Sequence, residues 1–103
     1  TLEFINTVGN LYYKQSNHKN IAEKKISYFL DYLRTKYSVK TIQLNDELVT
    51  QLSEKSVVDS KEIKKMFDLI NLISISKSIK QVTLIELNNL IENFYTKTGA
   101  YGK

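Results

Sequence analysis

YYKQSNHKNIAEKKISYFLDYLRTKY, from Tyr12 to Tyr37, is the stretch around which the rest of the chain can be arranged. Its second half carries apolar side chains at the spacing of one helical face, namely Ala22, Ile26, Phe29, Leu30, Leu33 and Tyr37. The opposite face is polar. Asn20 and Glu23 have the spacing of a capping box after the polar run 16–20. We therefore predict an amphipathic helix that begins at Asn20 and packs its apolar face against the other elements.

Similar periodicity before and after this stretch predicts further helices. The apolar residues of segment 2–15 share one face, and the segment is expected to be helical. The connector 38–44 should place Val39 and Ile42 in the core. Asn45 should then cap a short helix whose buried residues are Leu48, Val49 and Leu52.

Two longer helices are expected in the second half. One should begin at Asp59 or Ser60 and bury Ile63, Met66, Phe67, Ile70 and Ile73, with Leu69 and Leu72 widening its apolar face. The last should begin at a capping box of Thr83 and Glu86, with Val82 against Leu87, and should end before Gly99. The sequence thus predicts an all-α fold, a compact bundle of about five helices forming one domain over 1–103.

Composition limits the chemistry available to the chain. Its 103 residues include no Cys, which excludes disulfides and thiolate metal sites, and no apolar run approaches the roughly 20 residues of a membrane span. His18 is the only histidine, and no carboxylates lie at metal-ligand spacing from it. Phosphate-binding and nucleophile motifs are absent from the sequence. We expect no catalytic, cofactor or metal site, and hence no enzyme.

Charge is distributed unevenly along the sequence. Residues 1–40 hold seven Lys or Arg against three acids, whereas residues 41–103 hold eight of each. The net charge of +4 therefore belongs to the first part of the chain. We predict an interaction surface there, for a protein or an anionic membrane surface. Its residues are His18, Asn20, Lys24, Lys25, Tyr28, Tyr32 and Arg34.

An alternative hypothesis places a helix-turn-helix between Leu48 and Phe67, with Val57 at the turn position that usually takes Gly. Its nucleic-acid face would be Ser60, Lys61, Lys64 and Lys65. Asp59, Glu62 and Asp68 offset the lysines, although phosphate binding depends on net positive charge. The aromatic and lysine mixture of 12–37 could also stack single-stranded bases. A protein partner is favoured over either nucleic acid.

Several segments together resemble a family of uncharacterised Bacteroidetes membrane-associated proteins that carry a domain of unknown function. They are LEFINTVGNLYY (2–13), HKNIAEKKISYFLDYLRTKY (18–37), QLNDELVTQLSEKS (43–56), EIKKMFDLI (62–70) and ELNNLIENFYTK (86–97). The resemblance implies a C-terminal fragment of a longer membrane protein, encoded near MoxR-type ATPases and lying on the cytoplasmic side of the inner membrane. It implies no activity or site residue. We expect a non-enzymatic protein-interaction or membrane-proximal scaffold domain.

Overall fold

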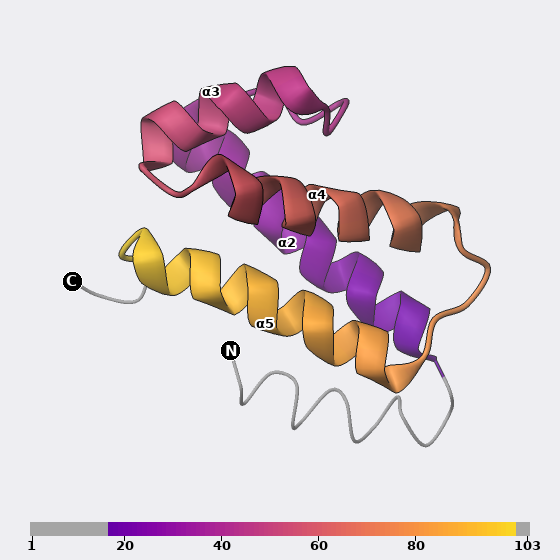
Figure 1. Ribbon diagram of the computed structural model, residues 1–103. Coiled ribbons are helices and arrows are strands. Elements are labelled where there is room, and N and C mark those ends of the chain that lie inside the picture. The colour runs from indigo at the N-terminus through magenta and orange to yellow at the C-terminus, as the bar shows by residue number, and fades with distance from the viewer. Residues whose placement is uncertain (1–16, 101–103) are drawn as a thin grey trace.

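The computed structural model describes residues 17–100, and this part of the chain folds into four helices without a β-strand (Figure 1). They are α2 (His18–Tyr37), α3 (Asp46–Ser56), α4 (Ser60–Ile75) and α5 (Gln81–Lys97). The all-α prediction is confirmed. Residues 17–100 contain four helices, against about five expected for the whole chain, and the helix predicted for segment 2–15 lies outside the described residues.

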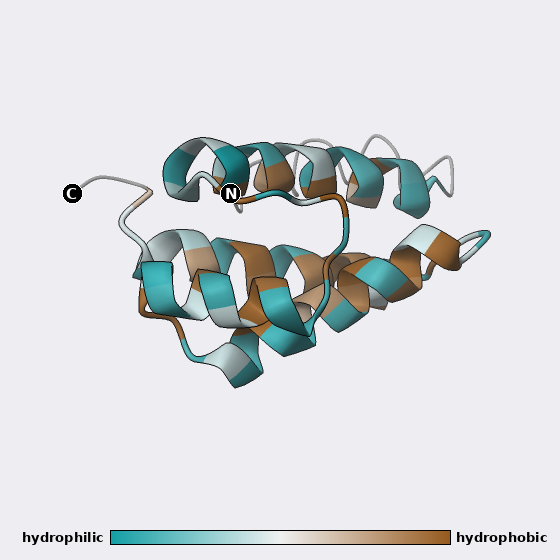
Figure 2. Cartoon of the chain, turned by 90° about the horizontal axis from the view of Figure 1, so that it is seen from above, coloured by the Kyte–Doolittle hydropathy of each residue, from teal (hydrophilic) through white to brown (hydrophobic). Residues whose placement is uncertain are grey.

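The helices pack so that α2 and α4 each contact every other described helix, whereas α3 and α5 do not contact each other. In Figure 1, α2 lies behind the other three helices. Figure 2 shows that its outer side is mainly polar and that apolar residues gather on the inner sides of the helices. Lys25 faces Glu92 and Tyr32 faces Thr98, so α2 and α5 run parallel.

One hydrophobic core joins the four helices. The faces predicted for the two middle helices are confirmed, because Leu48, Leu52, Ile63, Phe67 and Ile73 are all buried. Its largest fully buried side chains are Phe29, Phe67, Phe94, Ile21, Leu33, Leu52, Ile63, Met66, Ile70, Ile73, Leu87 and Ile91. Burial of such a face supplies most of the stability of a short helix.

Two of the expected helix starts and the expected helix end are confirmed. The Asn45 side chain accepts a hydrogen bond from the Leu48 N–H (3.0 Å), and Asp59 accepts one from the Lys61 N–H (3.2 Å). After α5, Gly99 adopts a φ of 76°, and Ala100 N–H donates to the Tyr95 carbonyl (2.9 Å). This is the Schellman arrangement, in which a left-handed residue turns the chain out of the helix.

Both capping boxes predicted from sequence are wrong. α2 begins at His18 and α5 at Gln81, each two residues before the predicted cap, and neither helix has a side-chain cap. The earlier start of α2 brings Ile21 into the core, where it is fully buried. Val82 is 66% exposed and therefore does not staple onto Leu87. For α2, burial of Ile21 contributes more than the roughly 1 kcal/mol of a side-chain cap.

Two apolar residues predicted to be buried are exposed instead. Ile42 is 90% exposed, and Leu44 packs against the core in its place, with its carbonyl accepting a hydrogen bond from Asn71 Nδ2 (3.2 Å). Leu72 on α4 is 55% exposed, so the buried face of α4 is narrower than predicted. Val39 is buried as expected.

The turn between α3 and α4 contains a β-branched residue in the left-handed region. Val57 has a φ of 65° and a ψ of 17°, its N–H donates to the Ser53 carbonyl (2.9 Å), and its side chain is exposed. A left-handed conformation costs an L-residue about 1–2 kcal/mol, a cost that glycine avoids. The turn therefore adopts the geometry that glycine favours while carrying a valine.

We predict that Val57→Gly raises the free energy of unfolding by about 1 kcal/mol, because it relieves the left-handed conformation without removing buried surface. Urea denaturation measures the change. Val82→Gly is the matched control, since Val82 is also exposed but lies in the first turn of α5, where glycine should lower stability. A decrease for Val57→Gly would contradict the prediction.

Candidate interaction surface

The side of α2 that faces α5 is built from aromatic rings. Phe29 meets Phe94 edge to face, with ring centroids 5.5 Å apart, and Tyr32 meets Tyr95 in the same way at 4.9 Å. Tyr37 adds a further ring 6.3 Å from that of Tyr32. Perpendicular pairs place the positive ring edge against the negative ring face, which favours this geometry over flat stacking. The cluster joins the second half of α2 to the last turn of α5.

Lys25 lies in the contact between α2 and α5, called the seam below, and not on the predicted interaction surface. The residue is only 5% exposed, and its ammonium forms an ion pair with the carboxylate of Glu92. It also lies 5.7 Å from the Tyr95 ring centroid. A lysine at this depth needs a partner, because burial of an isolated charge is strongly unfavourable. Lys25 therefore serves the packing of α2 against α5.

Tyr32 also belongs mainly to the seam. Its ring is half-buried, and its hydroxyl shares a hydrogen bond with Thr98 Oγ1 (2.7 Å). Beside it, Lys36 Nζ donates to the Thr98 carbonyl (2.6 Å) and lies 5.7 Å from the ring centroids of both Tyr32 and Tyr37. A lysine at this position complements the negative end of the α5 dipole. Tyr32 and Lys36 thus fasten the end of α5 to α2.

Burial changes the acidity of the tyrosines in the seam. It raises the pKa of Tyr95 to about 12, with further contributions from the negative charge of Glu92 and from Tyr32. The pKa of Tyr37 is also raised, mainly by burial. Both phenols therefore stay protonated at neutral pH and can only act as neutral packing and hydrogen-bonding groups.

The remaining predicted residues lie on or near the outer side of α2. Lys24, Tyr28 and Arg34 are exposed, and Arg34 contacts Asp31 (3.7 Å) and donates to Thr41 Oγ1 (2.5 Å). His18 and Asn20 lie half-buried in the first turn of α2, which begins earlier than predicted. Lys24 and Tyr28 lie one helical turn apart, and both are exposed members of the predicted interaction surface.

The alternative nucleic-acid face lies at the beginning of α4. Ser60, Lys61 and Lys65 are exposed there. Lys64 lies 3.3 Å from both Asp46 and Asp68, whose carboxylates raise the pKa of its ammonium. Its positive charge is therefore partly neutralised within the domain, which weakens the case for phosphate contact.

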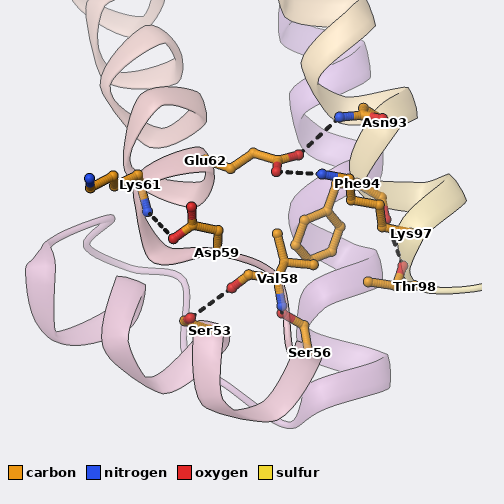
Figure 3. A network of polar contacts seen from close by, with 10 residues as sticks. All are labelled: Ser53, Ser56, Val58, Asp59, Lys61, Glu62, Asn93, Phe94, Lys97 and Thr98. Atoms are coloured by element: carbon orange, nitrogen blue, oxygen red, sulfur yellow. Dashed lines mark hydrogen bonds and ion pairs between the residues drawn. The ribbon is translucent and has the colours of Figure 1, made fainter.

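Figure 3 shows how the α3–α4 turn is fixed between the helices. Ser53 Oγ donates to the Val58 carbonyl (2.7 Å), and the buried Val58 side chain points toward Phe94. Glu62 accepts hydrogen bonds from Asn93 Nδ2 (3.0 Å) and Lys97 Nζ (2.7 Å), so the start of α4 is tied to the end of α5. The acidic Glu62 and the basic Lys97 therefore bind each other within the domain rather than a ligand.

Sequence reasoning missed Glu92, Thr98 and Lys36 as structural residues. Each contacts a residue more than sixty positions away in the chain, and helical spacing carries no signal for such pairs. Between residues 17 and 100, no group of three His, Cys, Asp or Glu side chains is placed to hold a metal ion. Within the same residues, no helix is long and apolar enough to cross a bilayer.

Within residues 17–100, the fold and its polar contacts define an all-α arrangement in which the buried Lys25 serves packing and the outer side of α2 carries exposed residues. The chain belongs to the family of the DUF4350 C-terminal helical domain, whose model matches residues 5–98. This is a family of unknown function. No curated protein and no solved structure matches the chain. The Bacteroidetes origin and the association with MoxR-type ATPases stay predictions.

We predict that Lys25→Met lowers the free energy of unfolding by about 3 kcal/mol, because it removes one side of a largely buried ion pair with Glu92. Replacing both residues, as in Lys25→Met with Glu92→Leu, should recover part of the loss. Chemical denaturation measures both effects. Lys24→Met is the matched control for an exposed neighbour, and equal losses for Lys24→Met and Lys25→Met would contradict the assignment.

We also predict a loss of stability at high pH that depends on Tyr95. A folded-state pKa of about 12, raised from 10.0, means that the folded protein holds this proton more tightly than the unfolded chain. The stability from Tyr95 is therefore fully present below pH 10 and is lost as the pH rises toward 12. Tyr95→Phe should flatten the decline in thermal midpoint over this interval. Tyr28→Phe is the control, because Tyr28 is exposed and lies outside the seam, and this substitution should leave the decline in thermal midpoint unchanged.

Proposed function

We propose that the domain is a non-enzymatic interaction module that meets a partner protein through the outer side of α2. Within this proposal it works on the cytoplasmic side of the inner membrane as part of a longer chain, as the family resemblance implies. The outer side of α2 is defined here by the exposed residues Lys24, Tyr28, Asp31 and Arg34.

The exposure of Tyr28 is the observation that carries the proposal. Residues 17–100 contain seven aromatic side chains, and of these Tyr28 alone is exposed, at 68%, while the others are buried or half-buried. Tyrosine and arginine are enriched at the centres of protein interfaces, and a tyrosine ring provides a large contact area at little cost in conformational entropy. An exposed tyrosine among charged residues is therefore a suitable anchor for a protein partner.

The charged residues around Tyr28 are suited to form the polar rim of a protein–protein interface. Lys24 lies one turn before it and Asp31 and Arg34 follow, so both signs of charge flank the ring. Exposed charges of this kind contribute more to the rate and specificity of association than to affinity. Lys25, buried with Glu92, is no longer part of the proposed surface.

The experiment that tests the proposal compares the proteins retained by the immobilised domain. We expect Lys24→Glu with Tyr28→Ala to lose, by at least tenfold, a partner that wild type retains, a change that corresponds to about 1.4 kcal/mol. The lost partner must then bind the purified domain directly. Lys61→Glu with Ile42→Ala is the matched control, because it also changes one exposed lysine and one exposed large side chain. Equal recovery by the two double variants would refute the proposal.

DNA binding is the second candidate, and the α3–α4 pair with its three-residue connection favours it. Against it stands the neutralisation of Lys64 by Asp46 and Asp68. Non-specific duplex binding should appear first at low salt, so titration of random duplex with Lys61→Glu and Lys65→Glu variants distinguishes the candidates. Undetectable binding at low salt would eliminate DNA recognition.

A further inference from the structure

Exposed aliphatic side chains lie on both sides of the connection between α4 and α5. Ile75, in the last turn of α4, is 84% exposed, and Leu72, one turn earlier, is 55% exposed. Val82, in the first turn of α5, is 66% exposed. Together with Lys77 and Lys80 of the connection, these residues are called the α4–α5 tip. Three such side chains within eleven residues of the sequence make this connection a candidate contact surface.

The charge of the tip is positive. Lys77 and Lys80 are both exposed, and the sequence contains no acidic residue between Asp68 and Glu86. Lys19 adds a third cation, because its ammonium donates a hydrogen bond to the Ser76 carbonyl, although it also lies 3.7 Å from Glu23. The apolar side chains of the tip are therefore surrounded mainly by positive charge.

The backbone adds to this charge distribution. The contact between Lys19 and Ser76 places the beginning of α2 beside the connection, where α5 also begins. Neither helix has an acidic residue in its first turn, whereas α3 has Asp46 and Glu47 and α4 has Glu62. The positive ends of two helix dipoles thus lie near three lysines, of which Lys19 is partly offset by Glu23.

The shape of the tip suits a lipid surface better than a protein. The hollow beside it, about 360 Å³ in volume, is lined by Leu72, Ile79 and Thr83 among others, whereas Ile75 and Val82 do not line it and are largely exposed to solvent. A stable protein interface needs roughly 800 Å² from each partner, which three aliphatic side chains do not supply. A bilayer surface accepts projecting aliphatic groups without a complementary groove, and its anionic headgroups match the lysines.

We propose that the α4–α5 tip is a peripheral binding site for an anionic lipid surface. Leu72, Ile75 and Val82 enter the boundary between headgroups and acyl chains, while Lys77 and Lys80 contact the headgroups. The site is separate from the outer side of α2 and goes beyond the protein-interaction role proposed for that face. Binding is expected to be reversible, because only a few aliphatic groups are inserted.

The absence of tryptophan from the chain makes the test specific. Ile75→Trp places a single indole at the tip, and Val57→Trp places one at an equally exposed aliphatic position at the other end of α4. Vesicles of phosphatidylcholine, with or without phosphatidylglycerol, are added to each protein. We expect a blue shift and quenching by brominated lipid for Ile75→Trp with the anionic vesicles, and neither for Val57→Trp.

Charge removal provides the second measurement. Lys77→Ala with Lys80→Ala should weaken vesicle binding by about 25-fold, since each lysine near an anionic surface contributes about fivefold. Lys61→Ala with Lys65→Ala removes the same charge from another exposed site and should change binding little. Lys24→Glu with Tyr28→Ala should keep vesicle binding, so failure of one proposal is distinguishable from failure of the other.

Three results would overturn the proposal. Equal shifts for Ile75→Trp and Val57→Trp would indicate general adsorption of a basic protein. A concentration-dependent shift of Ile75→Trp without vesicles would identify the tip as a contact with a second copy of the chain. The third result is that Ile75→Trp shows no blue shift with anionic vesicles while inorganic phosphate raises the thermal stability of the domain. The lysines would then bind a soluble anion rather than a lipid surface.

Discussion

The packing of α2 against α5 is the contact on which the rest of the structure depends. These helices are the first and last that the structure describes, and they run parallel, so no short connection joins them. Phe29 against Phe94 and the ion pair of Lys25 with Glu92 hold them together. Because α4 packs against both helices, their alignment also determines the space that its buried face must fill.

This contact also changes how the basic character of the chain is interpreted. Seven Lys or Arg in residues 1–40 suggest a basic surface, yet Lys25 is buried and Lys36 sits over two tyrosine rings beside the end of α5. On α4, Lys64 is held between two carboxylates. Several cations therefore stabilise helix contacts and helix ends, and net charge alone overestimates the surface available to an anionic partner.

The sequence predicts features that depend on local spacing and misses those that depend on tertiary contacts. The buried residues of α3 and α4 follow from helical periodicity, and Asn45, Asp59 and Gly99 follow from the short-range chemistry of helix ends. Lys24 and Tyr28, both predicted for the interaction surface, are exposed. Lys25, predicted for the same surface, is buried against Glu92, which lies 67 residues away in the chain, and no local sequence pattern can encode such a contact.

The parallel arrangement of α2 and α5 has a mechanical consequence. Residue 17 lies beside the α4–α5 connection, whereas residue 100 lies beyond the far end of α5, so the path of the chain enters and leaves this part of the domain at opposite ends. The separation is on the order of one 20-residue helix, about 30 Å. A pulling force applied between these two positions would act along the seam. Resistance would then come from the ring contacts and the Lys25–Glu92 ion pair loaded together in shear, rather than from contacts broken one after another.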